Sequence, residues 1–475
     1  MQRVDSIRRD NTTFVLLSFE GPDQYSCVGK LGERVTHLAE TLAQMGFETH
    51  LLFVGDPNAP GHEIIGGDKL HLHRWCQWIS RYHPESAYQA EEAKLWDLNQ
   101  SAPPFVVNDI IKKSAFGGKL VVVQGEEWHS AEAISRIADL SLAEGLGESV
   151  LTLWNANDVH SFSRIDWVRL TSKSFITTVS KYMKHLMWKM GINPLVIPNG
   201  IPRRLLLNAD ESRADLIRKA YESSTLLVKF ADWQPGRRWR SAVEAIAGLK
   251  SRGKRSTLIA GGRYVDDNSQ RHEAVVVRHA KELGLAVVDV ELRDSGIDEQ
   301  IAALAAAAAA DVVHIKSPAS DELVRLLYSV GDYVLADSDH EPFGLQALEA
   351  MAAGAIVFTG CTGEDYADPL VNAIVLETDG PDEIVEYALY LDERQEERER
   401  IRLSARQTAQ RHTWDEVAAN LIGKIEYLLR TKSTDRPSYI QMPPVNWAAP
   451  LPLSPARVRS LFQSRNPYQP NARAS

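Results

Sequence analysis

Two glutamates have seven residues between them: Glu341 precedes an expected helix, and Glu349 lies inside it. Pro342 and Gly344 are typical of a helix start, and Gly354 follows as a helix end. Because a carboxylate accepts hydrogen bonds from two neighbouring hydroxyls, this pair suits a sugar and a ribose. The helix start should also offer free backbone N–H groups and a positive dipole end to a diphosphate or a sugar hydroxyl. We assign these N–H groups to Phe343, Gly344 and Leu345.

The two glutamates could also have purely structural roles, without binding a ligand. In that case Glu341 only complements the helix dipole, and Glu349 is a solvated helix residue. Glu349, however, stands in the stretch Leu-Gln-Ala-Leu-Glu-Ala-Met-Ala-Ala, which is too apolar for an ordinary exposed face. We therefore favour a binding site.

The elements that position these residues come in two series. Short β-branched runs alternate with helical periodicity, as at 31–45 and 130–143, which predicts an α/β protein with parallel sheets covered by helices. Ligands of such doubly wound, Rossmann-like domains bind outside the carboxyl ends of the strands. Two domains facing each other would thus enclose an interdomain cleft. The expected strands are 14–18, 49–54, 120–123, 150–153, 226–230, 257–260, 287–289, 312–315, 333–336 and 355–359.

A break in the alternation indicates the domain boundary. Residues 196–202, Val-Ile-Pro-Asn-Gly-Ile-Pro, contain two prolines and an Asn-Gly turn. Aromatic residues recur among the prolines of the C-terminal tail, and we expect this tail to cover apolar surface on the first domain. The expected divisions are a first domain at 1–200, a second at 201–412, a C-terminal helix at 413–432 and a proline-rich tail at 433–475.

The composition is typical of a globular protein that acts on small molecules. The 475 residues carry 53 basic and 63 acidic side chains, and the net charge of −10 disfavours nucleic acid as a partner. Three cysteines without metal-site spacing and the lack of an apolar leader predict a cytoplasmic protein with reduced thiols. Between Asp166 and Asp210 there are basic residues but no acids, so a phosphorylated acceptor or an anionic membrane stays open as a partner.

The stretch EPFGLQALE, which contains both glutamates, resembles the signature of a known enzyme family. This is glycosyltransferase family 4, the retaining nucleotide-sugar glycosyltransferases of the glycogen synthase and sucrose synthase type, which have the GT-B fold. The resemblance runs from about Val15 to Tyr427, and VIPNGI at 196–201 is similar to the family's interdomain segment. It implies that Glu341 holds the donor sugar and Glu349 the nucleotide ribose. It also implies an acceptor-binding first domain and a nucleotide-sugar-binding second domain.

A glycine-containing segment near the N-terminus, 29–35, is similar to the family's glycine-rich loop and first helix. Glycines after a first strand let the backbone approach a phosphate or a sugar closely. The resemblance thus implies donor contacts at Gly29 and Gly32. Lys30 replaces the usual second glycine, and it either adds a cation toward the diphosphate or faces water.

The segment 230–239 resembles the family's stretch in which an Arg and a Lys neutralise the leaving diphosphate. Aligned on Pro235, the position of the Arg holds Asp232, and that of the Lys falls on Arg237 or Arg238. An arginine can bind a phosphate through two N–H groups, whereas an aspartate repels it. The resemblance therefore implies one catalytic cation in this chain, at Arg237 or Arg238, where the family has two.

Two further segments follow expected strands of the first domain. Gln-Gly-Glu-Glu-Trp-His-Ser-Ala at 124–131 resembles a stretch of glycogen synthases, so Glu127 and His129 are candidates to contact acceptor or donor hydroxyls. Alternatively, His129 caps the next helix or is internally hydrogen-bonded. Trp154 stands where the family commonly has a histidine that contacts the donor sugar. Either His160 or Asn155 replaces that contact, or the tryptophan stacks on a sugar ring.

Together these features predict an enzyme that transfers a sugar from a nucleotide diphosphate sugar (UDP-, ADP- or GDP-sugar) to a carbohydrate or small hydroxyl acceptor, with retention. No cofactor and no required metal are implied. Two alternatives stay open: a GT-B disaccharide phosphorylase, and a non-catalytic module that binds a sugar nucleotide or a partner protein. The donor base, the acceptor and the oligomeric state are not determined by the sequence.

Overall fold

The computed structural model describes residues 6–265, 267–292, 296–339, 341–360, 363 and 365–431. These residues belong to one compact unit. The proline-rich tail from 433 lies outside the described residues, and so does the expectation that it covers the first domain. Cys27 and Cys76 carry free thiols.

The first sheet contains eight strands in the order β3-β4-β2-β1-β5-β6-β7-β8. Neighbouring strands pair in parallel, except that β3 runs antiparallel to β4. The bounds are β1 Thr12–Leu17, β2 Glu48–Val54, β3 His62–Ile65, β4 Leu70–Trp75, β5 Leu120–Glu126, β6 Val150–Ala156, β7 Phe175–Thr178 and β8 Leu195–Val196.

Helices cover both faces of this sheet because each central strand is apolar on both sides. Val15 and Leu17 of β1 belong to the apolar cluster that includes α3 and α5, whereas Phe14 and Leu16 pack in the cluster of α1 and α16. The helices are α1 Lys30–Gln44, α2 Gln77–Ser80, α3 Glu91–Phe105, α4 Lys112–Phe116, α5 Ala131–Ala143, α6 Trp167–Lys173 and α7 Lys181–Trp188, with a π-helical turn Val106–Ile111 between α3 and α4.

The second sheet is parallel throughout its seven strands, in the order β11-β12-β10-β9-β13-β14-β15. Its strands are β9 Thr225–Phe230, β10 Ser256–Gly261, β11 Val287–Val290, β12 Val312–Ile315, β13 Tyr333–Leu335, β14 Ile356–Thr359 and β15 Ile374–Val375. The helices around it are α8 Glu211–Tyr221, α9 Trp239–Ser251, α10 Asp267–Glu282, α11 Ile297–Ala306, α12 Asp321–Val330, α13 Leu345–Ala352, α14 Asp382–Asp392 and α15 Gln395–Gln410.

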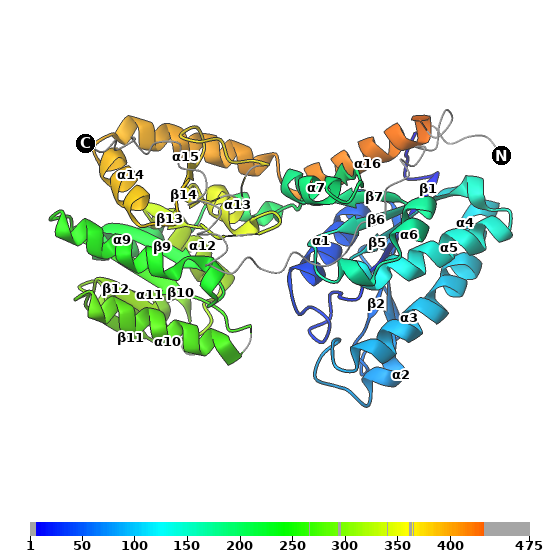
Figure 1. Ribbon diagram of the computed structural model, residues 1–475, viewed down its shortest axis with the longest axis horizontal. Coiled ribbons are helices and arrows are strands. Elements are labelled where there is room, and N and C mark those ends of the chain that lie inside the picture. The colour runs from blue at the N-terminus through cyan, green and yellow to red at the C-terminus, as the bar shows by residue number, and fades with distance from the viewer. Residues whose placement is uncertain are drawn as a thin grey trace, which may run out of the picture. The chain divides into compact units, whose positions relative to one another are not determined.

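The last described helix, α16 Trp414–Thr431, returns to the domain of the first sheet (Figure 1). Its apolar side chains pack in one cluster with those of α1. The two chain crossings between the sheets lie side by side: Ile201 N–H donates to the carbonyl of His412 at 2.9 Å, and Trp414 N–H donates to that of Ile201 at 3.2 Å. A Cβ at Gly200 would lie 2.9 Å from Trp414, so this crossing needs glycine.

The two-domain α/β fold and the ten expected strands are confirmed. The sequence analysis missed β3, β4, β7, β8 and β15, which are short or carry polar residues. Two of the basic residues that follow Asp166 are paired with acids. Arg169 pairs with Glu132 at 2.7 Å and Lys173 with Asp139 at 2.6 Å, because α5 places acids beside them.

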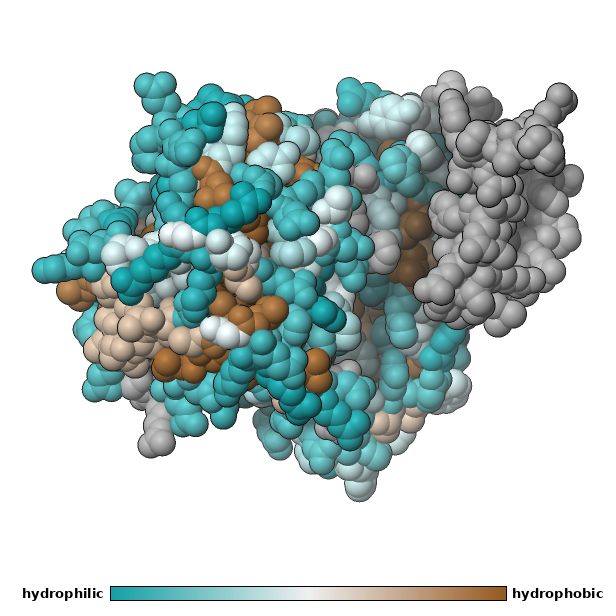
Figure 2. All heavy atoms as spheres, turned by 60° about the vertical axis from the view of Figure 1, so that its left-hand side comes forward, coloured by the Kyte–Doolittle hydropathy of each residue, from teal (hydrophilic) through white to brown (hydrophobic). Residues whose placement is uncertain are grey.

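The surface is mainly hydrophilic on the face shown in Figure 2, with hydrophobic residues gathered in smaller groups among the hydrophilic ones. Among the helices of the described ranges, none combines the length and the apolar character that crossing a membrane requires.

Candidate functional site

One cavity of about 780 Å³ is lined by residues that follow the strands of both sheets. Parallel strands place their carboxyl ends at one edge, so segments far apart in sequence converge there. The expected cleft is therefore present. Its wall from the first sheet includes Glu20, Lys30, Glu33, Tyr88, Glu91, Glu127, His129 and His160, and its wall from the second includes Asp232, Arg237, Arg263, Tyr328, Glu341, Phe343, Gly344, Leu345 and Glu349.

On the second wall, Arg237 lies between two carboxylates. Its Nη1 is 2.8 Å from Oε1 of Glu341, and its Nη2 is 3.2 Å from Oδ2 of Asp232. Only 22% of the Arg237 side chain is exposed, so these pairs are stronger than surface pairs. Asp232, which stands at the position where the resemblance implied an arginine, thus contacts Arg237 directly.

Arg263 is a second cation at this wall, and the sequence analysis missed it. Its Nη2 lies 3.4 Å from Oδ1 of Asp232. It follows β10 by two residues, a position at the carboxyl end of a strand that could have indicated it. A Cβ at the preceding Gly262 would lie 2.1 Å from the carbonyl oxygen of Ala231, so glycine is required where the chain turns toward the cavity.

Arg238 is directed away from the cavity, although it follows Arg237 immediately. Its guanidinium pairs with Asp339 at 2.8 Å and with Asp379 at 2.7 Å. The backbone of Arg238 is left-handed, with φ +49°, and the helix α9 begins right after it. This turn sends the neighbouring side chains to different partners, so the structure brings Arg237 and not Arg238 to the site.

Helix α13 begins at Leu345, with Gly344 before it in the left-handed region at φ +74°. Phe343 is buried against Tyr366, and the hydroxyl of Tyr366 donates to the carbonyl of Gly344 at 2.5 Å. The helix start thus faces the cavity as expected, while the helix itself starts later than Pro342 indicated.

Glu349 projects from the first turns of α13 into the cavity. Desolvation by burial raises its pKa, and the nearby Lys30 ammonium opposes that rise. Nζ of Lys30 lies 4.0 Å from Oε1 of Glu349 and 2.8 Å from Oε2 of Glu33. Lys30 therefore faces carboxylates in the cavity, while its side chain stays 51% exposed to water.

The glycine-containing loop of the first wall already holds an anion. Oε2 of Glu20 accepts hydrogen bonds from the N–H groups of Gly29 and Gly32, both at 2.9 Å, and Tyr88 donates to Oε1 at 2.6 Å. Glu20 is 5% exposed. The sequence analysis missed this residue, although it comes three residues after β1 at the carboxyl edge of the sheet.

Glu127 has an unusual backbone for a residue with a long side chain, with φ +61° and ψ 170°. Strain of this kind is concentrated at functional sites. Its Oε1 accepts from the N–H of Asn157 at 2.5 Å, and the Nε1–H of Trp154 donates to its carbonyl at 2.9 Å. Burial, together with the nearby Asp158 carboxylate, raises the pKa of Glu127.

His129, on the same wall, is buried and contacted by aromatic rings and by a carboxylate. Its ring stacks on Phe19 and Trp128, with centroid distances of 4.3 and 3.8 Å, and Nε2 lies 2.8 Å from Oε1 of Glu91. Burial lowers the pKa of His129 to about 3, and Arg164 and His160 add to this effect. A neutral ring that donates from Nε2 leaves the buried Nδ1 without a hydrogen-bond partner.

Of the three other residues that were expected to contact a sugar, one lines the cavity and two do not. His160 lines the cavity and is exposed. Trp154 is fully buried in the apolar core, edge-on to Trp167 at 5.4 Å, and Asn155 donates to Glu126 inside the sheet at 2.9 Å. Since neither lines the cavity, the structure does not place Trp154 where it could stack on a sugar ring in that space.

The fold and the cavity define a class: two parallel-sheet α/β domains with ligand-binding edges, the GT-B architecture. Residues 235–408 match the family described as "Glycosyl transferases group 1". No curated protein matches the chain.

Solved structures of several enzymes have the same fold. Sucrose-phosphate synthase from Thermosynechococcus elongatus is 17% identical, with a TM-score of 0.62 over 89% of this chain and 100% of its own. The catalytic domain of starch synthase IV from Arabidopsis thaliana, bound to ADP and acarbose, is 15% identical, with a TM-score of 0.61 over 87% and 100%. HepE from Anabaena, in complex with UDP, is 13% identical, with a TM-score of 0.57 over 88% and 100%. At these identities the likeness concerns the fold.

Proposed function

We propose that this protein is a retaining glycosyltransferase of family 4 that transfers a sugar from a nucleotide diphosphate sugar to an acceptor hydroxyl. The observation that carries the proposal is the placement of Glu341 and Glu349 in one cavity together with Arg237. In this proposal the second domain, 201–412, binds the donor, and the first, 1–200, binds the acceptor. The solved structures with ADP or UDP support a nucleotide as the ligand class.

The residues can be given roles from their positions. Glu341 would hold the donor sugar hydroxyls, and Glu349 the ribose. Arg237 and Arg263 would share the negative charge of the diphosphate, which grows as its bond to the sugar breaks. Lys30 lies close enough to Glu349 to contact the same nucleotide.

The proposed reaction needs no general base from the protein. The bond between the anomeric carbon and the diphosphate oxygen breaks, and a bond to the acceptor oxygen forms on the same face of the sugar. The acceptor proton passes to the departing diphosphate. Glu127 and His129 line the first wall and are candidates for contacts with acceptor or donor hydroxyls, and closure of the cavity would exclude water from the cationic sugar.

The test is a turnover assay of the full-length chain with UDP-glucose, ADP-glucose and GDP-mannose over a panel of sugar acceptors. We expect release of the nucleoside diphosphate with one donor and an anomeric configuration in the product that matches the donor by NMR. The variant Glu341→Gln should lose turnover, and Glu222→Gln, an exposed glutamate after α8, should keep it.

The same assay separates the two alternatives. Dependence of product formation on inorganic phosphate and a disaccharide would indicate a phosphorylase. A thermal shift with a nucleotide but no turnover over the whole panel would contradict the transferase and favour a binding module.

A further inference from the structure

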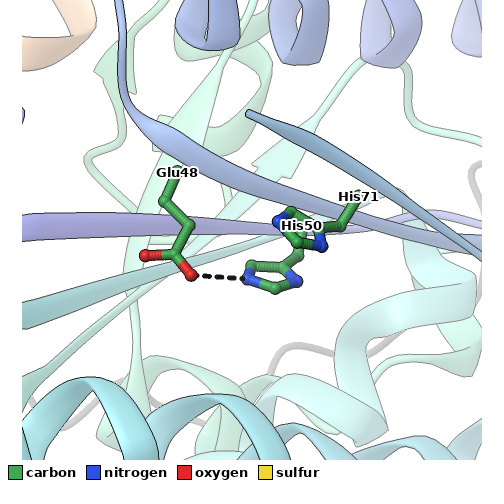
Figure 3. A group of neighbouring side chains, drawn as sticks. All are labelled: Glu48, His50 and His71. Carbon is green, nitrogen blue, oxygen red and sulfur yellow. Dashed lines mark ion pairs between the residues drawn. The ribbon is translucent and has the colours of Figure 1, made fainter. Parts of the chain in front are cut away.

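Four histidines gather on one face of the first sheet, away from the cavity residues. β2 and β4 pair in parallel with His50 opposite His71, and β3 and β4 pair with His62 opposite His73. Their rings are stacked, with centroid distances of 4.4 Å for the first pair and 4.7 Å for the second. Glu48 lies two residues before His50 on β2 and so projects from the same face. Figure 3 shows Glu48, His50 and His71 converging.

The ligand atoms of Glu48, His50 and His71 all lie within 4.8 Å of one another. Nε2 of His50 is 3.7 Å from Oε1 of Glu48 (Figure 3). This distance is too long for a hydrogen bond. It is close to the roughly 3.4 Å that separates two ligands of a tetrahedral zinc ion with metal–ligand bonds of about 2.0–2.1 Å.

Nε2 of His50 has no hydrogen-bond partner, although its side chain is only 9% exposed. A buried nitrogen with a free lone pair is costly unless something binds it. The other ring nitrogen, Nδ1, lies 3.0 Å from Nε2 of His73. If Nδ1–H donates to His73, the unprotonated Nε2 points at Glu48, as a metal ligand oriented by a neighbouring group does.

The remaining groups hold the ligands in place. Lys119 binds Oε2 of Glu48 at 2.6 Å, which leaves Oε1 to face His50. Nε2 of His62 lies 3.4 Å from Nδ1 of His71. Glu48 begins β2 and is therefore at the opposite end of the strand from the edge that lines the cavity.

We propose that Glu48, His50 and His71 bind one divalent transition-metal ion, with Zn²⁺ as the best fit, and a water in the fourth position. Two imidazoles and one carboxylate favour Zn²⁺ over Mg²⁺ or Ca²⁺, which take oxygen ligands. The ion joins β2 to β4 and thereby stabilises the pairing of these two strands, next to the edge strand β3. It takes no part in the proposed sugar transfer.

The test is calorimetric titration of Zn²⁺ into the full-length chain, purified without a histidine tag and dialysed against a chelator. We expect one saturable site, with affinity at least tenfold weaker in His71→Ala and in Glu48→Gln. The matched control is His185→Ala, which removes an exposed histidine of α7 and should bind as wild type. Mg²⁺ should not compete.

A second readout keeps the proposal testable if a variant is less stable. Co²⁺ bound by the wild type should show the visible absorption of a tetrahedral site, and this band should be lost in His71→Ala that circular dichroism shows to be folded. The proposal is overturned if the wild type shows no saturable Zn²⁺ binding, or if His71→Ala binds as tightly as His185→Ala. Nucleotide binding should be the same with and without Zn²⁺, so failure here leaves the proposed transferase untouched.

Discussion

The two walls of the cavity hold their charges in different ways. On the second wall Arg237 is paired with the carboxylates of Glu341 and Asp232. On the first wall the carboxylates of Glu20 and Glu127 are held by backbone N–H groups. An arginine between carboxylates keeps donors for a phosphate, whereas a loop whose N–H groups already bind a carboxylate has none to offer.

This difference changes where a diphosphate should bind. The resemblance implied that Gly29 and Gly32 contact the donor, but Glu20 occupies their N–H groups. We therefore expect the phosphates to bind near Arg237 and Arg263 on the second wall. The first wall would then serve hydroxyl groups, which carboxylates bind well.

The largest expected effect concerns Arg237. In Arg237→Ala we expect kcat to fall by about 100-fold or more, since a preorganised charge at the leaving group is lost, with a smaller change in the donor Kd. Steady-state kinetics and calorimetry would measure both. Arg238→Ala is the matched control, because this neighbour pairs with Asp339 and Asp379 instead. An equal loss of kcat in both variants would contradict the contrast between the two arginines.

The next effect concerns Glu349. In Glu349→Gln we expect donor binding to weaken by about 1 to 3 kcal/mol, because an amide has only one oxygen to accept from two ribose hydroxyls. Calorimetry with the preferred nucleotide would measure it. Glu222→Gln, which changes an exposed glutamate outside the cavity lining, is the control and should leave the Kd unchanged. An unchanged Kd in Glu349→Gln would remove this residue from the nucleotide site.

The third effect concerns Glu20, whose carboxylate holds the glycine-containing loop of the first wall. In Glu20→Ala we expect the free energy of unfolding to fall by about 2 kcal/mol, since the N–H groups of Gly29 and Gly32 lose a charged acceptor. Urea denaturation would measure the change, and Tyr88→Phe, which removes one hydrogen bond to the same carboxylate, should cost less. If the freed loop also gains affinity for inorganic phosphate, Glu20 is what keeps anions off this wall.

The smallest effect concerns the pH dependence of stability. The pKa of His129 is about 3 in the folded chain, below its ordinary value near 6.5, so the unfolded chain binds a proton that the folded chain does not. Stability is therefore lost as pH falls from about 6.5 toward 3. We expect His129→Asn to reduce this slope by about 1.4 kcal/mol per pH unit in urea denaturation between about pH 5.5 and 4, where the unfolded histidine is charged and the folded one is neutral. His185→Asn, at an exposed site, should leave the slope unchanged.

Local patterns in the sequence determined the alternation of strands and helices, the break at 196–202, and the helix that carries Glu349. These features depend on residues a few positions apart: apolar runs form buried strands, and Pro and Gly begin and end helices. For the same reason Glu341 and Glu349 could be placed together, since one helix start positions both.

Only the tertiary structure decided which other residues share a site. Glu20 meets the N–H groups of a later loop, Arg263 comes from a different strand than Arg237, and Arg238 turns away at a left-handed residue. The histidine cluster depends on the pairing of β2, β3 and β4. Of these, β3 was missed because it is short and mostly exposed, and β4 because its buried leucines alternate with histidines and an arginine. Such contacts follow from loop conformation, strand order and register, which bring together residues nine or more positions apart, and no local pattern of residue types encodes them.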